Sequence, residues 1–177
     1  MASPSSEVNR LLSASPSSFP LSRSALRPEA GACNLRSENP ALLFPGARHG
    51  EAALAGFLLR VGCWNESHTV AQDIQSAEGS YWHAIVHRIE PDSSNAAYWF
   101  RQVGSHAIFP ELLHRSAEML NNEAPAHWRL KAAWDPFLFI EWCDEVREKG
   151  GQGETAAIAI QMAEWQLLFD WCTRASS

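Results

Sequence analysis

Hydrophobic side chains recur at helical spacing along most of the chain after residue 40. In the segment Glu51–Trp64, Leu54, Phe57, Leu58 and Val61 stand at positions i, i+3, i+4 and i+7, which places them on one face of an α-helix. No stretch alternates apolar and polar residues with the period of two that a strand requires, and no internal repeat is apparent. The pattern therefore predicts an all-α fold.

Proline and glycine residues mark the ends of the predicted helices. Pro91 disfavours helix in the residue before it, and Gly104 is typical of a helix C-terminus. Pro110 and Pro136 each suit the first turn of a helix, because that position has no use for a backbone N–H. We expect a compact bundle of about six to seven helices, drawn from the segments Glu51–Trp64, His68–Ile74, Glu78–Glu90, Asn95–Val103, Pro110–Asn121, Phe137–Lys149 and Thr155–Arg174.

Residues 1–40 differ in composition from residues 41–177, which we interpret as a single all-α domain. Ser, Pro, Ala and Arg dominate this N-terminal segment, a composition that buries little apolar surface and is typical of an extended arm. A short helix over Glu7–Ala14, capped by Ser5 or Ser6, is compatible with it. The arm is expected to lie along its own domain or along a neighbouring subunit, as in a homo-oligomer. A transit-like segment is the alternative, since acidic residues are scarce there.

Charge and hydropathy exclude two classes of partner. The 177 residues contain 14 Lys+Arg against 20 Asp+Glu, giving a formal net charge of −6. No cationic patch is visible for displacing counterions from phosphates, so we expect no nucleic acid as partner. No apolar run approaches the ~18 residues of a membrane span, so we expect no membrane contact. The polar N-terminal segment lacks the apolar core of a secretory signal, which predicts a cytoplasmic location.

The four cysteines give no sign of a metal ribbon or a redox motif. Cys33, Cys63, Cys143 and Cys172 form no C-x-x-C pair. A chain of this length can build its core without disulfides, so we expect buried, reduced thiols. Nothing near Cys63 lowers the pKa of its thiol, so a nucleophile pair with His68 is disfavoured.

A polar stripe on the helix Glu78–Glu90 carries the candidate chemistry. His83 and His87 are four residues apart and project side by side, the spacing with which one helix supplies two metal ligands. Glu90 follows three residues later, so it can either join His87 as a ligand or orient its ring. His83 and Glu90 stand about 10 Å apart along the helix axis, which makes it hard for all three side chains to meet at one ion.

The run YWHAIVHRIEPDSSNAAYWFR, from Tyr81 to Arg101, resembles a family of small bacterial and fungal proteins with a W-H-x-x-x-H-R-x-E-x-D-x-x-N-A-x-Y-W core. The resemblance extends over roughly Leu54 to Phe109. Pro91 and the serines after Asp92 depart from the residues common in relatives, which leaves the turn shape open. The family brings no assigned activity, and the resemblance implies only that one group of residues belongs together: His68, Gln72, His83, His87, Glu90, Asp92, Asn95 and His106.

Two readings of function follow. In the first, a buried His/Glu-rich site holds a divalent transition metal, such as zinc, iron, nickel or manganese, and performs hydrolase- or lyase-like chemistry. In the second, the same residues form a metal-free pocket or a structural network in a non-catalytic binding or interaction module. The expected metal ligands are His83 and His87, with His68 or His106 completing the set. Glu90 and His106 are the catalytic candidates, and the ligand-binding candidates are His68, Gln72, Trp82, Asn95, Trp99 and Arg101.

Trp82, Trp99 and Arg101 are candidates for contact with a small molecule. Trp82 and Trp99 could wall a small-molecule pocket across the Pro91 turn. Arg101 could clamp an anion, although a surface salt bridge is the commoner fate of such a residue. Arg88 points away from the histidine stripe and is expected to pair with a distant acid. Whether the chain is an enzyme, and on which substrate, is left open.

Overall fold

The structure is a computed structural model that describes residues 3–120 and 132–175. Those residues contain α-helices and short 3-10 helices but no strand, which confirms the predicted all-α fold. The helix bounds agree with the predicted segments to within a few residues; Asn121, the predicted end of one helix, lies outside the described residues. The α-helices are α1 Ser6–Ala14, α2 Pro40–Leu43, α3 Gly50–Arg60, α4 Trp64–Asp73, α5 Ala77–Ile89, α6 Ser93–Val103, α7 Phe109–Leu120, α8 Pro136–Lys149 and α9 Gln152–Thr173, and the 3-10 helices are η1 Arg23–Ala25 and η2 Ala32–Ser37.

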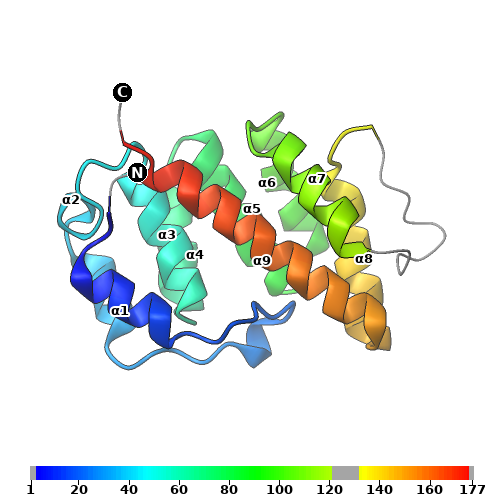
Figure 1. The fold of residues 1–177 in the computed structure, drawn as a ribbon, viewed down its shortest axis with the longest axis horizontal. Helices are drawn as coiled ribbons and strands as arrows, with labels where there is room; N and C mark the ends of the chain where they lie inside the picture. Colours follow the sequence, from blue (N-terminus) through cyan, green and yellow to red (C-terminus); the bar gives the residue numbers. More distant parts are fainter. Residues whose placement is uncertain (1–2, 121–131, 176–177) are drawn as a thin grey trace.

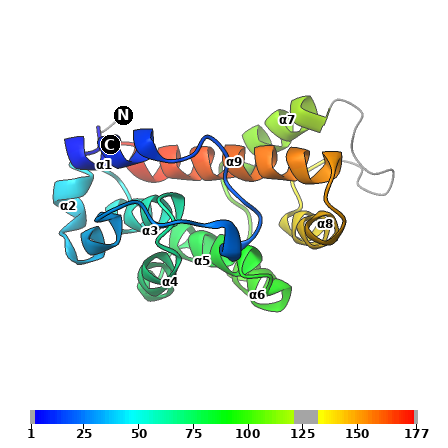
Figure 2. The same ribbon diagram turned by 90° about the horizontal axis from the view of Figure 1, so that it is seen from below.

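Helices α5 and α9 organise the bundle. The long helix α9 runs the length of the molecule (Figure 1) and packs against α3, α7 and α8. Figure 2 shows α3, α4, α5 and α6 together on one side of α9. Helix α5 packs against α3, α4 and α6, and every residue from Glu78 to Ile89 is buried. Polar side chains on α5 are therefore held inside the protein, where each needs a partner.

Side-chain caps explain where three of these helices begin. The Ser76 hydroxyl accepts a hydrogen bond from the Gly79 N–H at 3.2 Å and caps α5. Asp92 does the same for α6. Asp135 accepts from two backbone N–H groups at the start of α8, with Pro136 in the first turn. Each cap satisfies N–H groups that the helix itself leaves unpaired.

The N-terminal arm folds onto its own chain. Val8 and Leu11 of α1 and Phe19 beyond it are buried within the same hydrophobic core as α3, α5 and α9. The guanidinium of Arg60 donates a hydrogen bond to the Pro16 carbonyl. Ser5 caps α1 as expected. The arm thus lies along its own domain, and its use in a homo-oligomer stays a prediction.

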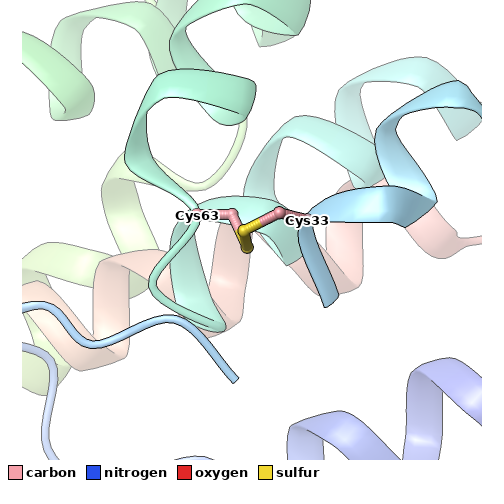
Figure 3. The surroundings of a disulfide bond; sticks show 2 residues. All are labelled: Cys33 and Cys63. Carbon is pink, nitrogen blue, oxygen red and sulfur yellow. A yellow bond between two sulfur atoms is a disulfide. The ribbon is translucent and has the colours of Figure 1, made fainter. Parts of the chain in front are cut away.

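One pair of cysteines contradicts the expectation of reduced thiols. Cys33 in η2 and Cys63 at the turn before α4 form a disulfide across 30 residues (Figure 3). The pairing arises because η2 packs against α3 and α4, a long-range contact with no signal in the cysteine spacing. Cys143 and Cys172 are free and buried, as expected, and burial raises the pKa of the Cys143 thiol to about 12.

A buried ion pair fixes α5 to α9. Arg88 and Glu164 are almost fully buried and contact each other directly, which confirms that Arg88 pairs with a distant acid. The Tyr81 hydroxyl donates to the same carboxylate at 3.0 Å. Gln161 accepts from Arg88 at 3.2 Å and donates to the Pro20 carbonyl at 2.7 Å. The network therefore joins α5, α9 and the arm. It lies on the side of α5 opposite the one that carries His83 and His87.

Among the described residues, none of the helices combines the length and the apolar character needed to cross a membrane.

Candidate metal centre

Three histidine side chains from two helices converge at one point, and we call them the histidine cluster: His68 of α4, and His83 and His87 of α5. The Nε2 atoms of His83 and His68 lie 3.1 Å apart. The Nε2 atoms of His83 and His87 also lie 3.1 Å apart. The i, i+4 spacing on α5 aligns two of the rings, and the packing of α4 against α5 supplies the third.

The geometry of the histidine cluster is not that of a hydrogen-bond chain. A neutral imidazole nitrogen carries either one hydrogen or one lone pair, so it can make one hydrogen bond. The Nε2 atom of His83 faces two other Nε2 atoms at hydrogen-bond distance. At most one of these contacts can be a hydrogen bond between neutral rings. A cation that accepts a lone pair from each nitrogen would satisfy all three at once.

Burial keeps two of these rings, those of His83 and His68, in the form that can bind a cation. Only 4% of His83 is exposed, and burial, followed by the neighbouring His87 and His68, lowers the pKa of His83 to about 3. Burial is also the main cause that lowers the pKa of His68. Because metal ligands must be unprotonated, His83 and His68 have their lone pairs available at neutral pH.

Glu90 lies on the outer side of His87. Its carboxylate is 3.2 Å from the Nδ1 atom of His87, whereas the cluster meets at Nε2. A hydrogen on Nδ1 donated to Glu90 leaves the lone pair on Nε2 pointing into the cluster. Of the two roles expected for Glu90, this geometry favours orienting the ring of His87, a common arrangement around metal-binding histidines.

Two tryptophans flank the histidine cluster. Trp99 of α6 stacks on His83, with ring centres 4.1 Å apart and planes 28° apart. Trp64 of α4 stacks on His68, with ring centres 5.2 Å apart. Trp99 was expected at the site. Trp64 was missed, although its position four residues before His68 is the spacing that brings helical side chains together.

Four predicted ligand-binding residues lie elsewhere. Asn95 is exposed and binds Asp92, its carboxamide donating at 2.6 Å, so it belongs to the cap of α6. Gln72 and Arg101 are also exposed, and the guanidinium of Arg101 lies 5.7 Å from the ring centre of Phe137. The structure therefore does not bring these three residues to the histidine cluster, and the cap of α6 accounts for the position of Asn95. The fourth such residue is Trp82.

Trp82 belongs to the hydrophobic core rather than to a pocket wall. It is fully buried, and its ring lies so close to Gly56 of α3 that a Cβ there would come within 2.4 Å of it. Glycine is therefore required at position 56 for α3 and α5 to approach. Trp82 directly precedes His83 in α5, and the rotation of about 100° per residue explains why the two side chains lie on different faces.

His106 joins a different carboxylate, Glu78 at the start of α5. The His106 Nε2 atom lies 3.8 Å and the His49 Nε2 atom 3.5 Å from the same Glu78 oxygen, and the Trp171 N–H donates to it at 3.0 Å. Although burial opposes the effect, His106 and then Trp171 hold the pKa of Glu78 well below its ordinary value. The expectation that His106 completes the metal ligands or acts beside them is not met in this geometry.

Comparison with known proteins adds no relative. A scan against protein-family models finds no match for this chain, and searches of curated proteins and of solved structures find none either. The resemblance carried by the segment Tyr81–Arg101 therefore stays a prediction. The functional argument rests on the geometry of the histidine cluster.

Proposed function

We propose that the protein binds one divalent transition-metal ion through the Nε2 atoms of His68, His83 and His87. The observation that carries the proposal is the position of His83 Nε2, which is 3.1 Å from both other nitrogens. Metal–nitrogen distances of about 2.0–2.1 Å in a tetrahedral site separate the ligand nitrogens by about 3.3 Å. Two of the three nitrogen–nitrogen separations are close to that value, and the ligand atoms of all three histidines lie within 4.8 Å of one another.

Three imidazole ligands leave a coordination position open, and this is the feature that separates catalytic from structural zinc sites. A metal ion held in this way supplies a bound water of lowered pKa or a Lewis acid for a small-molecule substrate. We therefore propose hydrolase- or lyase-like chemistry. His68, His83 and His87 hold the ion, Glu90 fixes the tautomer of His87, and Trp64 and Trp99 shield the rings. We assign His106 no part in this site.

The metal-free alternative, a structural network within a binding module, is weaker for a physical reason. Without a cation, the His83 nitrogen meets two neighbours with one hydrogen or one lone pair. One nitrogen would then remain unsatisfied or become protonated, and burial disfavours the protonated form. A network selected only for stability would avoid that cost.

The cytoplasmic location expected from the sequence stays a prediction, and one observation opposes it. The Cys33–Cys63 disulfide is the kind of bond that persists in oxidising compartments and is rare where glutathione keeps thiols reduced. Blocking free thiols in cells before lysis would decide this point. A disulfide found intact favours an oxidising compartment, whereas a fully reduced chain favours the cytoplasm.

Calorimetric titration with Zn²⁺ tests the metal proposal. We expect wild-type protein to bind about one ion per chain and the His87→Ala variant to lose that binding. His114→Ala is the matched control, because His114 is an exposed histidine that pairs with Glu118 on α7. Equal binding by His87→Ala and wild type would contradict the proposal.

A further inference from the structure

The side chain of Arg23, from the N-terminal arm, reaches the outer side of the histidine cluster. Its guanidinium lies 3.2 Å from the Glu90 carboxylate and donates to the Asn65 side chain at 2.9 Å. Its central carbon is also 3.7 Å from the ring centre of Trp64. One side chain from the arm thus contacts two residues of α4 and one residue at the C-terminal end of α5.

Two of the residues that Arg23 contacts are themselves in contact with the proposed metal ligands. Glu90 binds the Nδ1 atom of His87 at 3.2 Å, and Trp64 stacks on His68. Arg23 is therefore one residue removed from His87 along one path and one residue removed from His68 along the other. The planar guanidinium suits this geometry, because it can donate in its plane to oxygens while its face lies on an aromatic ring.

We propose that Arg23 is a positioning residue of the metal centre, which fixes the rings of His68 and His87 through Trp64 and Glu90. The inference rests on the proposed metal site and extends it to the arm. It implies that residues interpreted as an extended arm form the outer layer of the site. Partners that orient ligating histidines typically change metal affinity by about 10–100-fold when they are removed.

The fold holds Arg23 in place from both sides. Upstream, the carbonyls of Phe19 and Pro20 accept hydrogen bonds from Gln161 in the core. Downstream, the Glu29 N–H donates to the Val61 carbonyl at 2.9 Å, and the Cys33–Cys63 disulfide lies just beyond. The short helix η1 that carries Arg23 is thus tied at both ends. Such restraint is what a positioning residue requires.

Co²⁺ binding to Arg23→Met tests the proposal, because Met keeps an apolar stem and removes the guanidinium. We expect the dissociation constant for Co²⁺ to rise about tenfold or more and the visible absorption spectrum of bound Co²⁺ to change. Arg10→Met is the matched control, since Arg10 also lies on the arm in an exposed ion pair, with Glu7. It should leave both the affinity and the spectrum unchanged.

The outcomes separate this inference from the proposed function. If wild-type protein binds neither Co²⁺ nor Zn²⁺, the metal site itself is wrong. If it binds Co²⁺ and Arg23→Met gives the same affinity and spectrum, the metal site stands and the role of Arg23 is refuted.

A double-mutant cycle covers the case in which Arg23→Met also lowers the melting temperature of the metal-free protein. The effects of Arg23→Met and Glu90→Gln on Co²⁺ affinity should then be clearly less than additive, because both act on His87 through one path. Additive losses would overturn the proposal.

Discussion

Replacing the disulfide tests how the arm is attached to the helical core. The bond between Cys33 and Cys63 closes a loop with a sequence separation of 30. Removing it by the double substitution Cys33→Ala and Cys63→Ala releases the unfolded chain from that constraint. The loop-entropy relation gives a loss of about 3.6 kcal/mol in the free energy of unfolding at 25 °C. For a chain of this size, that corresponds to a fall of about 7–15 °C in melting temperature.

Urea unfolding of the metal-free protein, followed by tryptophan fluorescence, measures this loss. The wild-type protein treated with a dithiol reductant should unfold at nearly the same urea concentration as the double variant, because both lack the same cross-link. Cys143→Ala is the matched control: Cys143 is a buried thiol without a disulfide, and its loss costs only the burial of a small side chain, about 1 kcal/mol. A double variant within about 1 kcal/mol of wild type would refute the reasoning.

Three further predictions concern buried and capping groups. Arg88→Met leaves Glu164 as a buried charge without its ion-pair partner and should lower the free energy of unfolding in urea by about 3–5 kcal/mol. The double variant Arg88→Met with Glu164→Leu should recover most of that loss, and equal losses in the two variants would contradict this. The depressed pKa of Glu78 contributes stability at neutral pH that is lost as the pH falls below the ordinary value of 4.5. Glu78→Gln should therefore make the free energy of unfolding less dependent on pH in the acid range, and an unchanged dependence would refute the depressed pKa of Glu78. Asp135→Ala removes the cap of α8 and should lower the free energy of unfolding, measured by thermal unfolding, by about 1 kcal/mol. An unchanged stability would contradict this.

Much of the helical architecture could be predicted because its signals are local. Pro91, Gly104 and Pro136 end or begin helices for reasons that depend on their own backbone, and the structure has helix boundaries at these positions. The pairing of His83 with His87 is local in the same sense, because four residues of helix always bring two side chains together. Only His68, from a neighbouring helix, needed the tertiary packing to join them.

The parts that could not be predicted depend on contacts between distant segments. Arg23 meets Glu90 across 67 residues, and no composition or spacing rule links an arginine in a serine-rich arm to a helix end. The same holds for Cys33 with Cys63 and for His106 with Glu78. The arm was expected to lie along its own domain or along a neighbouring subunit, but its few apolar residues show no period that identifies Phe19 as a fully buried side chain.

The most direct test of the metal centre is elemental analysis of protein purified without a metal-affinity tag. The proposal predicts about one transition-metal ion per chain in the wild type and in His114→Ala, and almost none in the double variant His83→Ala with His87→Ala. Metal-free wild-type protein that also fails to take up Zn²⁺ or Co²⁺, or equal metal content in the double variant, would contradict the central claim that these histidines form a metal site.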